Sequence, residues 1–319
     1  MKKIKEQTIH CVVRIGGKLS NNKGLNRAGG GLSASALTEK DHQDIVFAAK
    51  HAVDYVAISF PRSAEDMQLA RSLLEAAGSD AGLVSKIERA EAIQELSAII
   101  DASDAVMVAR GDLGVEVGFA ELPGLQKLII TRSRELSKPV ITATQMLESM
   151  NFNSIPTRAE ASDVANAVLD GTDAVMLSAE TASGMYPVQA VEAMAEICLA
   201  AERQNQRPTL EMQNRTFAKI DESIAMAAVY TAKHLEVKAI VSLTIHGLVP
   251  LLVSRFQSNI PIYGVSNQKM ARGRMTLYRG VYPVDFDISI YQRWELIRGL
   301  LTELREQGTV QIGERVIII

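Results

Sequence analysis

The sequence predicts an α/β protein: the C-terminal five βα units of a (β/α)8 TIM-type barrel, followed by a smaller α/β domain. Between residues 40 and 200, short apolar segments alternate with amphipathic ones. Near-continuous apolar strands are typical of a parallel sheet whose faces are covered. Polar residues gather where these strands end, as they do at the functional face of such barrels. After a polar linker at 203–215, a second alternation of helix and strand begins.

The barrel part contains five expected strands, each followed by a helix. The expected strands are 54–60, 82–87, 104–109, 139–144 and 173–178, and the helices are 63–78, 91–103, 122–137, 157–171 and 186–204. Ser63 and Gly78 mark the start and stop of the first helix. Thr157 and Glu160 have the spacing of a capping box. Because a barrel of this type has eight strands, we expect three of them to be missing from this chain.

The second part is expected to contain one long helix and four strands. The helix is 221–236, and the strands are 238–244, 260–266, 280–286 and 315–319. Near the N-terminus, 8–17 is expected to form one alternating strand with no local partner, and 20–33 is a glycine-rich connection.

Composition excludes several classes of protein. A net charge of −3 and a pI near 6.0 argue against nucleic-acid and anionic-membrane partners. No apolar run approaches the ~18 residues that span a bilayer, and residues 1–13 do not read as a signal peptide. Cys11 and Cys198 lie far apart and fit reduced thiols, so a cytoplasmic location is expected. The five histidines form no cluster that predicts zinc.

The strand in "GLVSKIERAEAI" (82–93) ends with two opposite charges on one face. Lys86 and Glu88 are two residues apart, so both point into the barrel mouth while Ile87 faces the helices. One interpretation is a structural ion pair. The other is a glutamate that holds a divalent metal ion beside a lysine that faces developing negative charge.

The next strand runs into "ARGDLG" (109–114) and offers a second carboxylate. Gly111 is expected to allow a tight turn. Asp112 then falls near the N-terminus of a helical turn, where free amides bind anions. With Glu88 one strand away, Asp112 completes a two-carboxylate metal site with positions open for water and substrate. Asp112 as a plain helix cap is the alternative.

Two further strand ends carry polar residues. Thr144 and Gln145 end the strand at 139–144, where the hydroxyl either bonds a reacting group or water, or only caps the strand. Ser178 and Glu180 follow the last strand of the five and are expected to be supporting or interface residues rather than to react.

Several long blocks, in order and spacing, resemble pyruvate kinases. They are "LSNNKGLN" (19–26), "LVSKIERAEAI" (83–93), "ARGDLGVE" (109–116), "ATQMLESM" (143–150), "PTRAEASDVANAVLDGTDAVMLSAET" (156–181) and "LYRGVYPV" (277–284). The resemblance covers nearly the whole chain and is strongest to the bacterial enzymes. It implies transfer of a phosphoryl group from phosphoenolpyruvate to ADP, giving pyruvate and ATP.

The resemblance also implies roles for individual residues. Lys86 stabilises the transferring phosphoryl group and the enolate oxygen, and Glu88 and Asp112 bind Mg²⁺ or Mn²⁺. The backbone of Gly111 and Asp112 holds the pyruvate carboxylate, and Thr144 lies near the methyl carbon that is protonated. These roles agree with general phosphoryl-transfer chemistry, in which cations neutralise charge on an in-line donor and acceptor.

The resemblance further implies a homotetramer, an activating K⁺ whose ligands are not found in this chain, and three domains. Residues 1–19 would be the remnant of an inserted β-rich lid, 20–205 a partial barrel, and 206–319 a C-terminal domain. We expect the chain to be incomplete and to have little kinase activity alone. The alternatives are a metal-dependent lyase or aldolase acting on pyruvate enolates, and a non-catalytic fragment that assembles or regulates.

Overall fold

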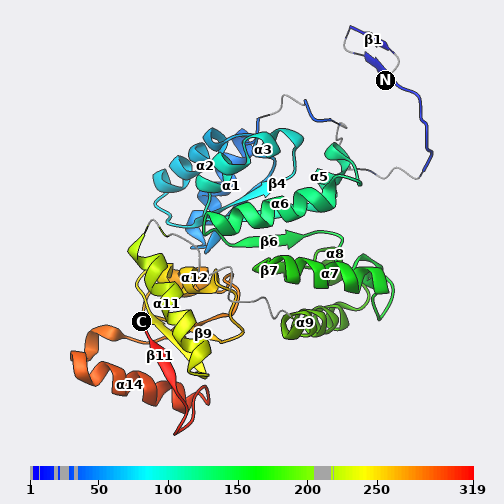
Figure 1. Ribbon diagram of the computed structural model, residues 1–319. Helices are drawn as coiled ribbons and strands as arrows, with labels where there is room; N and C mark the ends of the chain where they lie inside the picture. The colour runs from blue at the N-terminus through cyan, green and yellow to red at the C-terminus, as the bar shows by residue number, and fades with distance from the viewer. Residues whose placement is uncertain are drawn as a thin grey trace.

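A computed structural model describes residues 3–6, 8–17, 21, 29–31, 35–204, 217 and 219–319 (Figure 1). Its first large unit is a five-stranded parallel sheet in the sequential order β3-β4-β5-β6-β7. The strands are β3 (Tyr55–Ile58), β4 (Gly82–Ile87), β5 (Ala105–Ala109), β6 (Val140–Ala143) and β7 (Ala174–Met176). Each lies within two residues of its predicted bounds, and the predicted βα succession is confirmed.

Helices connect these strands. They are α1 (Glu39–Lys50), α2 (Ala64–Ala76), α3 (Ala90–Gln94), α4 (Leu96–Asp101), α5 (Arg110–Val117), α6 (Leu122–Glu135), α7 (Arg158–Asp170), α8 (Ala179–Ala182) and α9 (Pro187–Gln204), with a 3-10 turn η1 at Glu148–Asn151. The predicted capping box of α7 is present, because Thr157 accepts from the Glu160 amide and Glu160 accepts from the Thr157 amide. Ser63 precedes α2 as predicted, although its side chain makes no capping bond.

Alternation along the strands separates two faces of the sheet. Leu83, Ile87, Val106 and Val108 pack with the buried residues of α2, α4 and α6 in one apolar core. On the other face, Val84 belongs to a separate cluster of residues from β4, β5 and β6. Lys86 alternates with Val84 on that second face, so the predicted orientation of its side chain, away from the helical layer, follows from the register.

The second unit is a four-stranded parallel sheet in the order β10-β9-β8-β11. Its elements are α11 (Ile220–His234), β8 (Ala239–Leu243), α12 (Leu248–Ser254), β9 (Ile262–Ser266), α13 (Lys269–Met275), β10 (Val281–Asp285), a 3-10 turn η2 (Ile288–Ile290), α14 (Arg293–Glu306) and β11 (Val316–Ile318). Residues of α11, α12 and α13 contribute to one apolar core of this sheet, and residues of α14 to the other. Its strands and α11 match the predicted ranges.

Three predictions need correction. Residues 8–17 do not form one unpaired strand: β2 (Thr8–His10) pairs antiparallel with β1 (Lys3–Lys5), and Glu6, at φ 53°, lies between them. The helix expected at 91–103 is interrupted at Glu95, whose φ of −99° and ψ of 16° are not helical. Helices α1, α8, α12, α13 and α14 have no counterpart in the prediction. The expected connection at 20–33 lies mostly outside the described residues.

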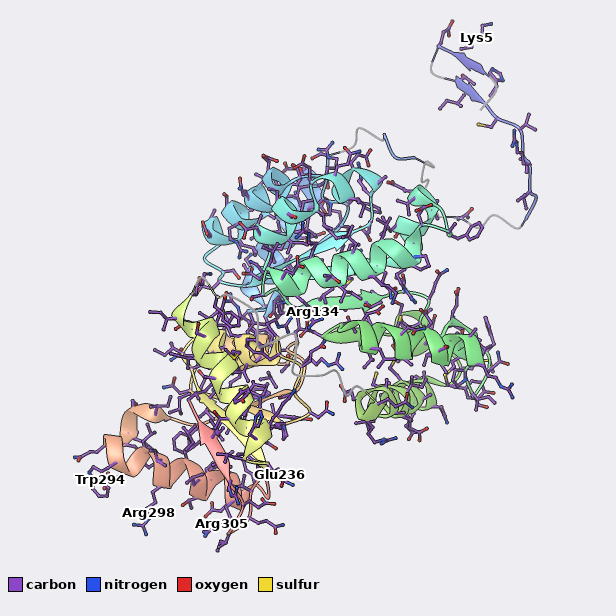
Figure 2. The ribbon with its side chains drawn as sticks, in the orientation of Figure 1. Lys5, Arg134, Glu236, Trp294, Arg298 and Arg305 are labelled. Atoms are coloured by element: carbon purple, nitrogen blue, oxygen red, sulfur yellow. The ribbon has the colours of Figure 1, made fainter. Side chains whose placement is uncertain are left out.

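The two units meet through a buried ionic contact. Asp173, just before β7, pairs with Arg255 at the end of α12, and only 1% and 6% of their side chains are exposed. The same carboxylate accepts from the Arg279 amide at 3.0 Å and from the Val140 amide of β6 at 3.0 Å. Arg134, labelled in Figure 2, reaches the Arg255 carbonyl at 3.4 Å. One carboxylate therefore joins both sheets.

Within the described residues, none of the helices combines the length and apolar character needed to cross a membrane.

Candidate active site

Lys86 and Glu88 lie at the carboxyl end of β4 and contact each other. Lys86 Nζ is 2.8 Å from Glu88 Oε1 and donates to Ser59 Oγ at 2.9 Å. The other carboxylate oxygen of Glu88 accepts from the Phe60 amide at 2.8 Å. Glu88 is only 1% exposed, whereas 26% of the Lys86 side chain is exposed. The Lys86 side chain is thus partly accessible to a ligand, while the Glu88 carboxylate is held by Lys86 of β4 and by Phe60, which follows β3.

Burial raises the pKa of Glu88 above its usual value, and the nearby charge of Asp112 acts in the same direction. The hydrogen bond and charge of Lys86 and the bond from the Phe60 amide oppose this rise in pKa. The pKa of Glu88 therefore senses Asp112 across the adjacent strands. A cation bound close to two such carboxylates stabilises their ionised forms and so opposes the effects of burial and of mutual repulsion.

These two carboxylates fit a divalent cation of the magnesium type. Their donors are hard oxygens, and Mg²⁺ in phosphoryl-transfer sites uses one or two carboxylates and fills its other positions with water and phosphate. Among the described residues no group of three or more His, Cys, Asp or Glu side chains could hold a metal ion. Glu88 and Asp112 are thus the two carboxylates at these strand ends whose donor chemistry suits such an ion.

Gly111 and Asp112 lie in the first turn of α5, which begins at Arg110 directly after β5. The predicted place of Asp112 at a helix N-terminus is confirmed. The expected tight turn at Gly111 is wrong, because Gly111 is helical and the chain changes direction at Ala109, with φ −92° and ψ 82°. A Cβ at Gly111 would lie 3.5 Å from Thr144 Oγ1. That distance is an ordinary van der Waals contact, so neither a turn nor a lack of space requires glycine at this position.

Thr144 follows β6 and bonds to the neighbouring strand end. Its Oγ1 accepts from the Gly111 amide at 2.8 Å and donates to the Ala143 carbonyl at 2.6 Å. A hydroxyl has one proton and two lone pairs, so one lone pair stays available for a water or a ligand. The sequence prediction that Thr144 and Gly111 meet at one site agrees with this geometry, and the Gly111 amide is occupied by Thr144 in this structure.

Sequence reasoning missed the residue that holds this strand end. Arg110 is 6% exposed and donates to the Thr144 carbonyl from Nε at 3.1 Å and from Nη2 at 2.7 Å. Its Nη2 also donates to the Gln145 carbonyl at 2.8 Å, and its Nη1 to Asp163 Oδ2 at 2.6 Å. Thr144 and Gln145 both have left-handed backbones, with φ of 68° and 54°. Neither is glycine, so no signal in the sequence marks this conformation.

Glu180 supports the same segment from the next strand. It is 2% exposed and accepts from the Leu147 amide at 3.2 Å and from the Ser178 amide at 2.8 Å. The expectation that Ser178 and Glu180 are supporting residues is consistent with these contacts, which fix the chain after Thr144 and leave Glu180 buried.

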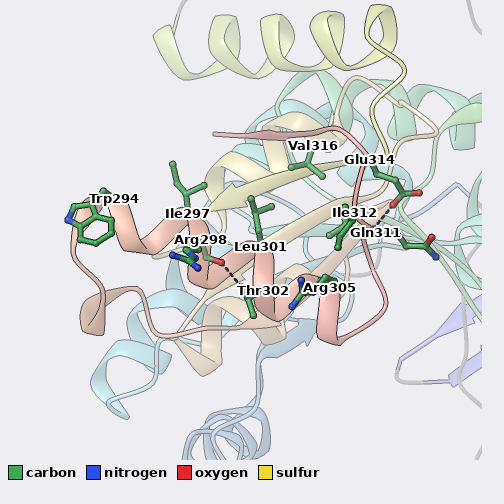
Figure 3. A pocket seen from close by; sticks show the side chains of 12 residues that line it. Trp294, Ile297, Arg298, Leu301, Thr302, Arg305, Gln311, Ile312, Glu314 and Val316 are labelled. Atoms are coloured by element: carbon green, nitrogen blue, oxygen red, sulfur yellow. Dashed lines mark hydrogen bonds between the residues drawn. The ribbon is translucent and has the colours of Figure 1, made fainter.

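A separate cavity of about 720 Å³ lies in the second unit, between α14 and the loop before β11 (Figure 3). Ile297, Leu301 and Val316 line it, with Trp294, Arg298 and Arg305 at its α14 wall. None of the predicted site residues lines this cavity. They lie instead at the carboxyl ends of β4, β5 and β6, and we place the candidate active site there.

Comparison with known proteins gives a consistent result for both units. The family model "Pyruvate kinase, barrel domain" matches residues 1–191, and "Pyruvate kinase, alpha/beta domain" matches residues 222–319. Pyruvate kinase II of Salmonella typhimurium is 52% identical over 314 residues, which are 96% of this chain and 65% of the relative. A pyruvate kinase of Haemophilus influenzae is 50% identical over 315 residues, with the same coverage of 96% and 65%.

A solved structure is similar as well. The crystal structure of a pyruvate kinase from Cryptosporidium parvum superposes with a TM-score of 0.88 at 35% identity and covers 92% of this chain and 62% of that one. The chain thus spans 65% of the length of the two curated bacterial relatives.

Proposed function

The chain belongs to the pyruvate kinase family, and we propose that its site transfers a phosphoryl group from phosphoenolpyruvate to ADP, giving pyruvate and ATP. The observation that carries the proposal is the convergence of Lys86, the Glu88–Asp112 carboxylates and Thr144 at three adjacent strand ends. This is the arrangement that an enolate intermediate requires: a cation for the oxygen, carboxylates for a metal, and a hydroxyl beside the carbon.

In the proposed reaction, the bond between phosphorus and the enol oxygen breaks as a bond to a terminal oxygen of ADP forms. The Lys86 side chain is about a quarter exposed, and we propose that its ammonium faces the enolate oxygen and the transferring group and neutralises their charge. The carboxylate of the substrate lies at the N-terminus of α5, where the first amides of a helix lack helical partners. If the Gly111 amide takes part, it exchanges its bond to Thr144 for one to the substrate.

Protonation at carbon completes the reaction. Because the proton of the Thr144 hydroxyl is directed to the Ala143 carbonyl, we propose that Thr144 accepts a hydrogen bond from a water that in turn protonates the methylene carbon. Direct donation by Thr144 would first require its O–H to rotate away from Ala143. Thr144 is thereby a catalytic residue that orients the proton donor.

Glu88 and Asp112 are the residues that we propose to hold Mg²⁺ or Mn²⁺. The cation supplies charge neutralisation and orientation of the substrate oxygens. An activating K⁺ is proposed from membership of the family alone. A homotetramer and a cytoplasmic location are proposed on the same ground.

The alternative of a lyase or aldolase has less support, because the family models match both units and an aldolase does not require a lysine beside the metal carboxylates. A non-catalytic role is separated from the kinase by assay. The coupled assay measures kinase turnover by this chain, which spans 65% of the length of the two curated bacterial relatives. The partial reaction that uses only the described residues is exchange of the pyruvate methyl protons.

The test is therefore in two parts. Purified chain is incubated with phosphoenolpyruvate, ADP, Mg²⁺ and K⁺ in a coupled assay, and with pyruvate and Mg²⁺ in D₂O followed by proton NMR. We expect methyl exchange that needs the metal and is lost in Lys86→Met. Metal-independent exchange, or neither exchange nor phosphoryl transfer, would contradict the proposal, and aldol cleavage would favour the alternative.

A further inference from the structure

We infer that Arg110 is a positioning residue that sets the orientation of the Thr144 hydroxyl by holding Thr144 and Gln145 in a left-handed turn. The catalytic importance of this orientation rests on the proposed function. The positioning itself rests on the structure and is tested separately below.

The backbone at this point is costly by itself. A non-glycine residue at positive φ costs of the order of 1 kcal/mol, and here two such residues are consecutive, with φ of 68° and 54°. Thr144 is also β-branched, which makes this conformation less favourable still. A turn of this kind persists only when the surroundings determine it.

Arg110 holds the turn at Thr144 and Gln145 in this conformation. Within the described residues its guanidinium donates five hydrogen bonds, of which three go to the two carbonyls of the turn, two to Thr144 and one to Gln145. The other two, to Asp163 at 2.6 Å and to Gln126 Oε1 at 3.4 Å, orient the guanidinium from behind. A planar fork can satisfy both carbonyls at once, whereas a lysine ammonium has no such geometry. The identity of residue 110 therefore matters beyond its charge.

The turn then decides where the hydroxyl lies. With the carbonyls of Thr144 and Gln145 held by Arg110, Thr144 Oγ1 lies 2.8 Å from the Gly111 amide. Gly111 is the second residue of α5, so its amide has no acceptor within the helix. Arg110 and Gly111 are adjacent in the chain, so both ends of the Thr144 residue, its carbonyl and its hydroxyl, are bound by the start of α5.

This arrangement gives a probe that does not depend on activity. Hydrogen exchange of the Gly111 amide reports whether Thr144 Oγ1 is in place, because loss of one hydrogen bond accelerates exchange by about tenfold. Selective ¹⁵N-glycine labelling limits the spectrum to the 21 glycines of the chain. Gly114, one turn further along α5, reports on the helix itself and is the internal control.

Three variants separate positioning from simple charge pairing. In Arg110→Lys the charge near Asp163 remains but the fork is lost, and we expect Gly111 exchange about tenfold faster with Gly114 unchanged. In Asp163→Asn the ion pair is lost but the fork remains, and we expect Gly111 exchange within about twofold of wild type. In Arg110→Ala, added guanidinium at millimolar concentration should restore slow exchange. The open cavity of about 390 Å³ lined by Arg110, Gln145 and Asp163 gives it access.

The link between this positioning and catalysis is tested by measuring pyruvate methyl exchange in the same variants. We expect kcat to fall about 100-fold in Arg110→Lys, the scale of a misplaced proton-transfer group, with KM for pyruvate little changed and Asp163→Asn near wild type. If the wild-type protein does not exchange the pyruvate methyl protons, but the Gly111 amide exchanges faster in Arg110→Lys and not in Asp163→Asn, the positioning role is supported and the proposed function is not. Equal effects of Arg110→Lys and Asp163→Asn, or unaltered Gly111 exchange in Arg110→Lys, would overturn the inference.

Discussion

Replacement of Lys86 by methionine should destabilise the protein through Glu88 rather than through packing. The change removes the bond of 2.8 Å to a carboxylate that is 1% exposed, and the bond of 2.9 Å to Ser59. Deleting one partner of a buried pair costs about 3–5 kcal/mol. Here we expect the lower end, about 3 kcal/mol, because the Phe60 amide still donates to Glu88 and Lys86 is partly exposed.

The dependence on pH follows from the sign of the pKa shift. Burial already raises the pKa of Glu88, and loss of Lys86 removes the largest effect that opposes this rise. A folded-state pKa above the unfolded value means that ionised Glu88 destabilises the fold at higher pH. The penalty in Lys86→Met is therefore full near pH 8 and shrinks as pH falls through the raised pKa, where Glu88 takes up a proton.

The assay is equilibrium urea unfolding at several pH values, followed by circular dichroism and by tryptophan fluorescence. Trp294 is the single tryptophan of the chain and lies in α14, so its fluorescence follows the second unit. The double variant Lys86→Met/Glu88→Gln carries no buried charge at this point, and we expect it to recover about 2 kcal/mol of the loss. A Lys86→Met variant within about 0.5 kcal/mol of wild type at pH 8, or a double variant as unstable as the single one, would refute this reasoning.

Four further outcomes are expected. In kinetic assays of methyl exchange or phosphoryl transfer, Lys86→Met should lower kcat by about 10³-fold or more, while Mn²⁺ affinity at pH 8, measured by electron paramagnetic resonance, stays close to wild type. Mn²⁺ affinity should decline as pH falls, and the midpoint of this decline should lie above the ordinary glutamate pKa of about 4.3. In Glu88→Gln this pH-dependent decline should be absent. A midpoint at or below the ordinary glutamate pKa would contradict the raised pKa of Glu88. Gly171→Ala should destabilise the fold by about 1 kcal/mol or more and lower the melting temperature accordingly, because Gly171 has φ 101° and a Cβ there would lie 2.9 Å from an Arg134 nitrogen. The matched control is Gly124→Ala in α6, where no atom lies within 4 Å of the added Cβ, and this variant should be more stable by about 0.5–1 kcal/mol. Asp173→Asn should cost about 3 kcal/mol in urea unfolding, and a loss below about 0.5 kcal/mol would show that the contact between the units contributes little.

The strands were predictable because burial on both faces makes them short apolar runs with polar ends. All five strands of the first sheet and all four of the second lie within two residues of their expected bounds. Helices α12 and α13 were not found, because each is only seven residues long and too short for a clear helical period. Helix α1 begins with a capping box at Thr38 and Asp41, and this local pattern is sufficient to predict where the helix starts.

In the candidate site, too, some features follow from local sequence patterns and others do not. Period-two alternation places Lys86 and Glu88 on one face without any tertiary information, and Asp112 at a helix start follows from its position after a strand. The contact between Arg110 and the turn at Thr144 and Gln145 joins residues 34 and 35 positions apart. No local pattern encodes such a contact, and left-handed backbone at non-glycine residues is invisible to propensity. Sequence reasoning thus named the groups that we propose to react and gave no role to Arg110, which holds the turn at Thr144 and Gln145.

The Asp173 carboxylate has a consequence for how the chain is synthesised. Its partners Arg255 and Arg279 lie 82 and 106 residues later in the sequence. On a ribosome, the strands β3 to β7 emerge before either arginine, so until the second unit has been made the Asp173 carboxylate has the Val140 amide and water as its partners. We therefore expect the burial of this carboxylate, and the ordering of β7 around it, to be completed only when the second unit folds. Arrest of translation before Arg255 would leave a nascent chain whose β7 is more open to protease than that of the released protein.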